Sequence, residues 1–229
     1  MAFVSFTSIP NFDPHKVPVV GMDAHLPAVH AQALTPAALR ARFAQPPVWM
    51  PEIREEPRFT DRAPAQAAVL VAIVMRERPT ILLTQRTANM STHSNQIAFA
   101  GGKVDKTDAS VQAAALREAL EEIALDPSYC EVLGNLPHYV TGTAFTITPV
   151  VALVKPGFSL QANPGEVADV FEVPLDFLMN PAYHARHQIE WQNMQREWFS
   201  MTWQDDKQER FIWGATAGML RNLYRFLIA

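Results

Sequence analysis

The stretch AAVLVAIVM, residues 67–75, most constrains what this chain can fold into, because it is an unbroken run of apolar side chains. A strand with one wet face alternates apolar and polar residues, whereas a continuous run is consistent with a strand buried on both faces. A second run, TILLTQR (residues 80–86), follows the turn RERP, so we expect the two to pair as a hairpin. The later segments CEVLGNLPHYV and FTITPVVALV are also typical of strands. Strands interleaved with helices predict an α/β fold with a mixed β-sheet sandwiched by helices.

The clearest helix pattern is DASVQAAALREALEEIAL, residues 108–125, which is filled by alanine, leucine and glutamate. We expect Asp108 to cap this helix. Pro174 is expected to start a short helix in VPLDFLMN. The alternating runs HARHQIEWQ and REWFSMTWQ predict another hairpin, and FIWGATAGMLRNLYRFLIA predicts a closing amphipathic helix.

Residues 1–65 are rich in proline, which argues against long regular elements there. We predict an N-terminal arm over residues 1–65, which wraps the domain or a partner, and one domain over residues 66–229. Within the arm, TPAALRARF (residues 35–43) predicts a short helix capped by its threonine. The aromatic side chains of Phe43 and Trp49 require burial, which argues against a disordered linker.

Composition excludes several classes of function. The formal net charge of −4 gives no general attraction to nucleic acid or to anionic membranes. No segment approaches the roughly 20 apolar residues that span a bilayer. The first residues lack the pattern of a signal peptide. Cys130 is the only cysteine, so no internal disulfide is possible, and we expect the protein in the cytoplasm.

Three carboxylates are crowded in the helix of residues 108–125. At about 100° per residue, Glu118, Glu121 and Glu122 fall within one arc of roughly 100°. One interpretation is a solvated acidic face, with Arg117 paired to Glu121 at i,i+4. The side chains expected to pack on the sheet lie on the opposite side of the helix: Leu116, Leu120 and Ile123.

The other interpretation is a metal site. Three close carboxylates are hard oxygen ligands of the kind that suit Mg²⁺ or Mn²⁺. Gly101 and Gly102 precede the helix and allow close backbone approach, so that a carbonyl could complete the coordination. Mg²⁺ is usually held by a few carboxylates together with substrate phosphates, which predicts a phosphorylated substrate. Such an ion would neutralise a diphosphate and generate hydroxide from water.

The glycine pair, Asp108 and REALEEIAL together resemble the Nudix box, in which a glycine and a spaced glutamate precede R-E-U-x-E-E-x-G-U, with U aliphatic. The resemblance implies a Nudix-type α/β/α sandwich around a mixed β-sheet. It also implies Mg²⁺-dependent hydrolysis of a nucleoside diphosphate linked to another group. The implied site residues are the metal ligands Glu118, Glu121 and Glu122 with the Gly101 carbonyl, and Arg117, which orients the glutamates by salt bridges.

The chain departs from the general box in three ways. The interval from Gly102 to Arg117 is one residue longer, the spaced glutamate is Asp108, and the late glycine is Ala124. The longer interval and the aspartate resemble one Nudix subgroup, the coenzyme A pyrophosphatases. We expect Ala124 only to tighten the helix end, because glycine there serves a turn.

The upstream stretch LLTQRTANMSTHSNQIAFAGG, residues 82–102, is similar to a signature of that subgroup. Ser91 stands where an arginine is expected, Asn95 replaces a glycine and Ala100 replaces a proline. Asparagine tolerates a left-handed backbone, so Asn95 is expected to keep the loop shape. An arginine at position 91 would have gripped a phosphate bidentately, so its loss bears on substrate identity. The implied substrate-binding residues are Arg86, His93, Gln96, Phe99 and Gly102.

A further carboxylate often acts as a ligand or base in Nudix enzymes, from a loop before the V-P-L segment. Glu166 is the candidate here, and an ordinary turn glutamate is the alternative. The leading hypothesis is hydrolysis of coenzyme A or acyl-CoA to 3′,5′-ADP and (acyl-)phosphopantetheine. The alternatives are a Nudix hydrolase of ADP-ribose or a dinucleotide, and a non-catalytic Nudix-fold binding or regulatory module. The arm and the tryptophan-rich hairpin are compatible with a homodimer.

Overall fold

The computed structural model describes residues 12–58, 60–88, 95–191 and 194–229. Its largest sheet is built around two strands, β2 (Ala65–Val74) and β8 (Phe145–Val154), which run parallel along their whole lengths. The expected hairpin is confirmed, because β3 (Thr80–Arg86) pairs antiparallel with β2. The order is β4-β3-β2-β8-β6, with β9 on β3, β5 on β2 and β7 on β8. The remaining strands of this sheet are β4 (Ile97–Ala98), β5 (Gly101–Lys103), β6 (Cys130–Asn135), β7 (Tyr139–Val140) and β9 (Val167–Pro174).

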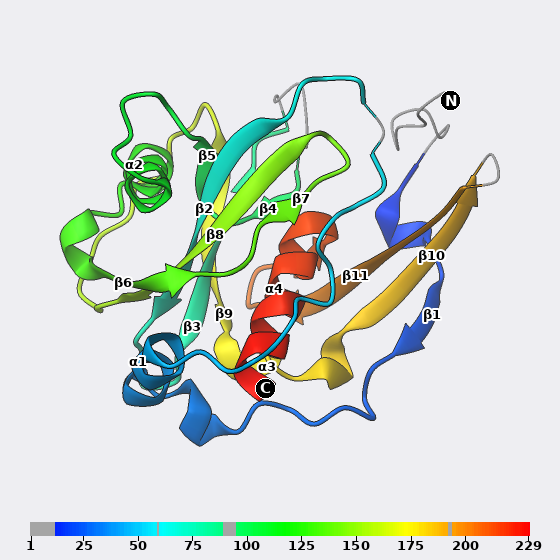
Figure 1. Cartoon of the computed structure of the whole chain (residues 1–229), viewed down its shortest axis with the longest axis horizontal. Helices are drawn as coiled ribbons and strands as arrows, with labels where there is room; N and C mark the ends of the chain where they lie inside the picture. The colour runs from blue at the N-terminus through cyan, green and yellow to red at the C-terminus, as the bar shows by residue number, and fades with distance from the viewer. Residues whose placement is uncertain (1–11, 59, 89–94, 192–193) are drawn as a thin grey trace.

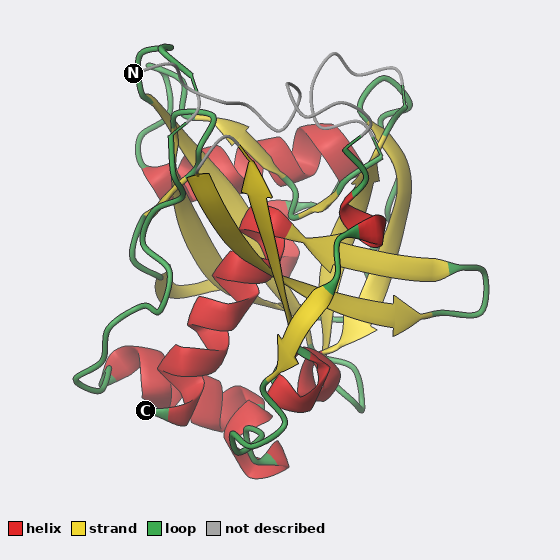
Figure 2. Ribbon diagram, turned by 90° about the vertical axis from the view of Figure 1, so that its right-hand side faces the viewer, coloured by secondary structure: helices red, strands yellow, loops and turns green. Residues whose placement is uncertain are grey.

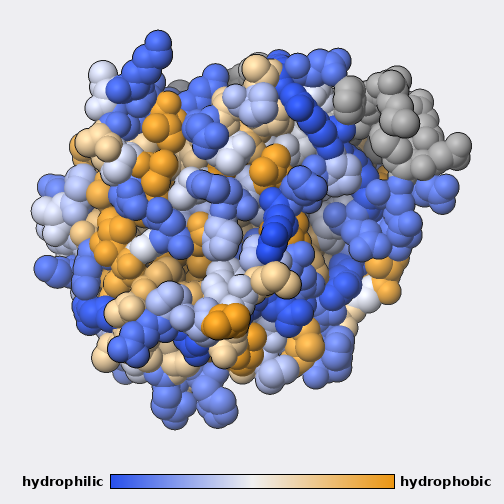
Figure 3. Space-filling model, viewed as in Figure 1, coloured by the Kyte–Doolittle hydropathy of each residue, from blue (hydrophilic) through white to orange (hydrophobic). Residues whose placement is uncertain are grey.

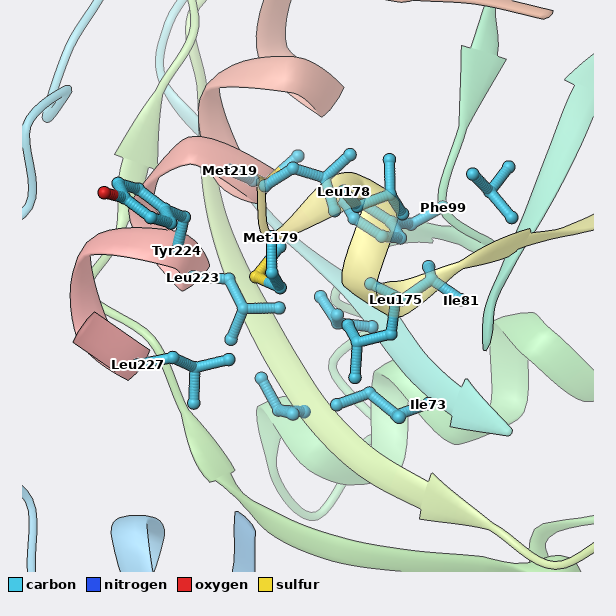
Figure 4. Close-up of a cluster of buried hydrophobic side chains, with 14 of the residues drawn as sticks. Ile73, Ile81, Phe99, Leu175, Leu178, Met179, Met219, Leu223, Tyr224 and Leu227 are labelled. Carbon is cyan, nitrogen blue, oxygen red and sulfur yellow. The ribbon is translucent and has the colours of Figure 1, made fainter. Parts of the chain in front are cut away.

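Both faces of this mixed sheet are covered, which explains the continuous apolar run in β2. Leu70 points to the face covered by α2 (Val111–Ile123), and Val71 points to the face covered by α4 (Gly214–Ile228). The two helices lie on opposite sides of β2 and β8 in Figure 1. Figure 4 shows the core on the α4 side, where Met219 lies near Leu178 and Leu223 lies near Met179. The predicted α/β/α sandwich is therefore confirmed.

A second sheet packs beyond α4. It is antiparallel, in the order β1-β10-β11-β12, and the expected second hairpin is its β10–β11 pair. Its side chains Phe199, Met201 and Ile212 share one hydrophobic core with α4. This sheet lies to the right of α4 in Figure 1 and toward the viewer in Figure 2. Its strands are β1 (Val19–Met22), β10 (Ala185–Trp191), β11 (Met194–Gln204) and β12 (Glu209–Trp213).

The structure corrects the expected start of the closing helix. Residues 211–213, which we expected in the helix, end strand β12 as its last three residues, and α4 begins at Gly214. The sequence pattern is ambiguous there because a strand runs directly into a helix without polar turn residues. No helix of the described residues is long and apolar enough to cross a bilayer.

The described part of the N-terminal arm packs on the rest of the chain. The expected short helix is confirmed as α1 (Pro36–Ala44), with the Thr35 hydroxyl accepting from the Ala38 N–H at 3.3 Å. The ring centroids of Phe43 and Trp49 lie 4.7 and 5.2 Å from that of Phe226 on α4. The boundary between arm and domain at residue 65 stays a prediction. The other short helices are η2 (Pro14–Lys16), η3 (Ala31–Leu34), α3 (Leu175–Leu178), η4 (Pro127–Tyr129) and η5 (Pro181–Tyr183).

Buried charges also tie the arm to the second sheet and α4. The fully buried guanidinium of Arg221 pairs with Asp23 at 2.8 Å and with Glu52 at 2.8 Å, both from the arm. Its Nη1 donates to His184 Nδ1 at 3.1 Å. Arg186 on β10 binds the same Asp23 through its Nε at 2.9 Å. Because removing one member would leave a buried charge unpaired, this cluster holds the arm in one place.

Candidate active site

One pocket of the described residues lies away from the predicted chemistry. A pocket of about 360 Å³ lies among α1, β6 and the C-terminal end of α4. Hydrophobic side chains gather toward this side of the face shown in Figure 3. None of the predicted site residues within the described ranges lines the pocket. We therefore define the candidate site by the predicted site residues themselves, several of which lie close together where α2 packs on β5.

The start of α2 differs from the prediction. The helix begins at Val111, and Ser110, not Asp108, is the cap, since its hydroxyl accepts from the Ala113 N–H at 3.1 Å. Asp108 instead lies in the preceding loop, where its carboxylate accepts from the Asp105 N–H at 2.8 Å. The aspartate is thereby available to a side chain farther along the helix.

That partner is Arg117, which is held in place by carboxylates on two sides. Its Nε and Nη2 donate to Asp108 at 3.0 and 2.9 Å, a bidentate pair. Its Nη1 donates to Glu118 at 2.9 Å and to Glu121 at 3.0 Å. The hydrogen bonds to Asp108 are the main reason that the pKa of Arg117 is raised, and they lower the pKa of Asp108. Arg117 thus fixes the directions of two glutamates relative to the loop.

The buried face of α2 is rotated from the one we expected. Leu120 is 46% exposed, whereas Glu122 is only 4% exposed. The helix meets the sheet through small side chains, so that it lies close to the strands and the Glu122 carboxylate reaches beneath the glycine pair. The side chains buried on this face are Ala114, Ala115, Ala119 and Ile123.

Glu122 is the most perturbed carboxylate of the site. Burial raises its pKa to about 7, and the charges of Glu166 and Glu118 act in the same direction. The Gly101 N–H, which donates to its Oε2 at 3.1 Å, and the nearby Arg86 oppose the shift. The pKa of Glu118 is also raised, first by burial, against the opposing effect of its bonds to the arginine of the box.

The two glycines before α2 are needed for close approach. A Cβ on Gly101 would lie 2.4 Å from the carbonyl oxygen of Ala68. A Cβ on Gly102 would lie 2.5 Å from a carboxylate oxygen of Glu118. Any side chain at either position would displace β5 from β2 or push Glu118 from its place.

The donor set fits a divalent cation. Four carboxylates, from Glu118, Glu121, Glu122 and Glu166, are close enough for their charges to raise the pKa of a neighbour. Hard oxygen donors crowded in this way suit Mg²⁺ or Mn²⁺. In the described parts of the chain no three acidic, His or Cys side chains converge tightly enough to hold an ion as they stand. Two of the glutamates are turned to Arg117, so their carboxylates would have to rotate.

Arg86 ends β3 beside these carboxylates. Its Nη1 lies 4.0 Å from Glu122 Oε1, and its Nε is buried with no hydrogen-bond partner among the described residues. The backbone N–H of Arg86 donates to the Gln96 carbonyl at 3.0 Å, and that of Thr87 donates to the Glu166 carbonyl at 3.0 Å. These bonds bring together three of the predicted site residues, Arg86, Gln96 and Glu166, and place the last in the loop before β9, as expected.

Phe99 is corrected by the structure. Its side chain is 3% exposed and lies in the core on the α4 side, beside Leu178 in Figure 4. Packing in the core, rather than contact with a substrate, therefore accounts for an aromatic side chain at this position. His93 and Ser91 fall outside the described residues. Asn95 has a φ of 59°, the left-handed conformation expected for it.

Some contacts of the site could not be anticipated from the sequence. Asp108 was in the recognised motif, but its pairing with Arg117 depends on the path of the loop. Gln85, Asp169 and Arg210 join behind the site and are far apart in the chain. No local pattern marks them, because a buried guanidinium and its acceptors can come from any three elements.

Comparisons with known proteins give the family of the chain. The family model of the NUDIX domain matches residues 64–211. A Nudix hydrolase named NudL from Citrobacter koseri is 46% identical over 159 residues, which is 69% of this chain and 80% of that protein. NudL from Shigella flexneri serotype 5b is 44% identical over 174 residues, 76% of this chain and 86% of that protein. A crystal structure of a C. elegans Ap4A hydrolase is similar at 20% identity, over 52% of this chain and 85% of that chain, with a TM-score of 0.42. The matched residues 64–211 include β5, α2 and the loop that carries Glu166.

Proposed function

Because this chain belongs to the Nudix family and is a Nudix hydrolase, we propose that it hydrolyses the diphosphate bond of coenzyme A or acyl-CoA. The products are 3′,5′-ADP and phosphopantetheine or its acyl form, and the reaction depends on Mg²⁺ or Mn²⁺. The observation that carries the proposal is the cluster of carboxylates from Glu118, Glu121, Glu122 and Glu166 around the glycine pair. Such mutual repulsion is costly unless a cation lies among the carboxylates, and a cation held in this way can in turn bind the phosphates of an anionic substrate.

The proposed role of each residue combines the Nudix resemblance with the contacts of the described residues. A bound Mg²⁺ or Mn²⁺ would neutralise charge on the diphosphate and activate a water. Glu118, Glu121 and Glu122 would hold it with the Gly101 carbonyl, and Glu166 serves as a further ligand or as the base. Arg117 orients Glu118 and Glu121 through its Nη1. The residues proposed to contact the substrate are Arg86, His93, Gln96 and Gly102.

The coenzyme A assignment is supported by the stretch of residues 82–102. Its similarity to the subgroup signature includes the Arg86 position, and the left-handed backbone of Asn95 keeps a conformation in which glycine is the ordinary choice. Arg86 also carries the buried Nε that lacks a partner among the described residues, which suits an anionic ligand. Another nucleoside diphosphate derivative, ADP-ribose or a dinucleotide, is the second candidate. A non-catalytic module is less favoured because such a protein has no use for the crowded carboxylates.

A substrate panel tests the proposal. Coenzyme A, acetyl-CoA, a long-chain acyl-CoA, ADP-ribose and a diadenosine polyphosphate are incubated with Mg²⁺ or Mn²⁺, and products are identified by mass. Running the reaction in ¹⁸O-water shows which phosphate receives the new oxygen. We expect 3′,5′-ADP from the coenzyme A compounds at higher kcat/KM than any product of the other substrates. Turnover of ADP-ribose or the dinucleotide alone would replace the first candidate with the second, and no turnover of any compound would favour the binding module.

A further inference from the structure

Arg210 on β12 is a fully buried arginine that reaches out of the second sheet. Its Nε pairs with Asp205 at 2.6 Å, its Nη1 donates to Gln85 at 3.0 Å, and its Nη2 pairs with Asp169 at 2.5 Å. Its Cζ lies 3.9 Å from the centroid of the Phe171 ring, a cation–π contact. The guanidinium therefore uses all three nitrogens and one face, and its orientation is fixed.

The acceptors of Arg210 are themselves held. Asp205 accepts from the backbone N–H groups of Lys207 and Gln208 at 2.8 and 2.7 Å, so it is anchored in the turn between β11 and β12. The Gln208 amide also donates to Gln85 at 3.1 Å. Two donors of the second sheet, the side chains of Arg210 and Gln208, therefore bind the same side-chain oxygen of Gln85.

Gln85 and Asp169 stand next to the candidate active site. They are direct partners in the β3–β9 pair, and the register shifts between Gln85 and Arg86, which is an irregularity of the ladder. Arg86, one residue on, has its guanidinium 4.0 Å from Glu122, and Glu166 lies in the loop that leads into β9. Because successive side chains of a strand point to opposite faces, Gln85 meets Arg210 on one face while Arg86 meets the carboxylates on the other.

We propose that Arg210 is a positioning residue for the hydrolase reaction. By fixing Gln85 and Asp169 on the back of the sheet, it holds the irregular junction of β3 and β9 in the one arrangement that places Arg86 and Glu166 beside Glu122. The second sheet then contributes to catalysis without touching the substrate. The proposal rests on the proposed function, because Arg86 and Glu166 are the groups whose places matter.

The competing explanation is that Arg210 only joins the two sheets. Arg221 is a suitable comparison for this, since it is equally buried and ion-paired but its hydrogen bonds and ion pairs go to the arm and His184, and to none of the site residues that the structure describes. Both Arg210→Lys and Arg221→Lys keep a positive charge and lose the planar fork of donors. If Arg210 only joins the two sheets, both variants should have a lower free energy of unfolding and a kcat/KM close to that of the wild type.

The experiment compares Arg210→Lys, Arg221→Lys and the wild type at a temperature at which circular dichroism shows all three folded. The milder Gln85→Met removes the oxygen that accepts from both Arg210 and Gln208 but leaves no carboxylate unpaired. This variant replaces Arg210→Lys in the comparison if Arg210→Lys does not fold. For the best substrate of the panel, we expect Arg210→Lys to lose about tenfold or more in kcat/KM, since small displacements of binding groups are costly. Gln85→Met should lose a smaller part, and Arg221→Lys should stay within about twofold.

A second readout does not depend on turnover. The Thr87 N–H donates to Glu166 across the β3–β9 junction, and the Arg86 N–H donates to Gln96 on the β4 side of β3, so their hydrogen exchange reports the end of β3 on both of its edges. We expect faster exchange of these two amides in Arg210→Lys and unchanged exchange in Arg221→Lys. Equal losses of kcat/KM in both variants, or unchanged exchange at residues 86 and 87, would overturn the positioning role. If the wild type turned over no substrate, the proposed function would fail, and the exchange measurement would still decide whether Arg210 fixes this junction.

Discussion

Two residues adopt a left-handed backbone at positions where the Nudix resemblance expects glycine. Asn95 has a φ of 59° and Ala124, which ends α2, has a φ of 56°. Asparagine visits this conformation readily, whereas alanine pays a steric cost of about 1–2 kcal/mol. Both positions therefore have the backbone conformation that favours glycine, although neither residue is glycine. At Ala124 the N–H still closes the helix by donating to the Leu120 carbonyl at 3.0 Å.

Replacing Ala124 by glycine should therefore stabilise the protein. Relief of the left-handed strain exceeds the extra chain entropy of glycine, and we expect a gain of roughly 0.5–1 kcal/mol in the free energy of unfolding. Urea unfolding followed by circular dichroism measures it. Ala119→Gly, in the same helix with ordinary helical geometry and a buried methyl group, should lose at least about 1 kcal/mol. A loss at both positions would contradict the strain at Ala124.

Glu122→Gln tests the buried carboxylate of the α2 cluster. The amide is isosteric and its oxygen can still accept from the Gly101 N–H, so we expect the unfolding temperature to be kept. Loss of a ligand or base charge should lower kcat/KM by about a hundredfold or more on the best substrate of the panel. The exposed Glu131, paired with Arg40 at 2.7 Å, provides the control, and Glu131→Gln should retain full activity. Wild-type activity of Glu122→Gln would remove it from the site.

At the scale of elements, periodicity predicted α2 but not its rotation. The pattern of residues 108–125 predicts that leucines meet the sheet, because burial normally follows side-chain size. The structure instead packs Ala114, Ala115 and Ala119 on the strands, which draws the helix close enough for Glu122 to enter beneath Gly101. The burial of Glu122 beneath Gly101 thus takes the place of the leucine packing that the hydrophobic pattern predicts. Sequence alone could not show this, since Leu120 and Ile123 look equivalent in it.

A pair of alanine substitutions distinguishes the two rotations of α2. Ile123 is 1% exposed, so Ile123→Ala should cost about 2–5 kcal/mol in the free energy of unfolding. Leu120 is 46% exposed, so Leu120→Ala should cost less than about 1 kcal/mol. Chemical denaturation of both variants gives the two values. Similar large costs at both positions would restore the helix face that the sequence predicts.

At the scale of the molecule, the sequence predicted the central sandwich better than what surrounds it. Two hairpins, the helix-covered mixed sheet and the short helix of the arm were all predictable from local patterns. The separate second sheet was not, because β1 comes from the arm and joins β10 across most of the chain. The buried cluster of Arg221, Asp23 and Glu52 was hidden for the same reason. Contacts between residues so far apart in the sequence depend on how the whole chain packs, and they produce no periodic pattern of hydrophobic residues.

That cluster predicts a pH dependence. His184 is held neutral, with Nε2 donating to the Leu178 carbonyl at 2.8 Å and Nδ1 accepting from Arg221. Burial first, and then the charge of Arg221, lower the pKa of His184 to about 4 from an ordinary value of 6.5. The unfolded chain therefore takes up the proton first, and this group's contribution to stability is present above pH 6.5 and lost as the pH falls toward 4, by roughly 3 kcal/mol.

The difference between wild type and His184→Gln isolates this effect. Glutamine can make the same two hydrogen bonds but does not titrate. Glu122, whose raised pKa acts with the opposite sign between about pH 7 and 4.5, is present in both proteins and cancels. We expect the stability of the wild type relative to the variant to fall between pH 7 and 4, as measured by urea unfolding at several pH values. A difference that stays constant with pH would contradict the prediction, because it would show that His184 has the same pKa in the folded and the unfolded protein.

The parallel pairing of β2 with β8 also has a consequence for how the chain reaches this structure. Every residue from Met75 to Ala144, including the glycine pair and all of α2, lies between these two strands in the chain. Their ladder can form only after that long segment has been closed into a loop, which costs entropy before any contact repays it. High contact order of this kind slows folding. Helix α2, which carries three of the clustered glutamates, thus lies inside a loop that must close before β2 and β8 can pair.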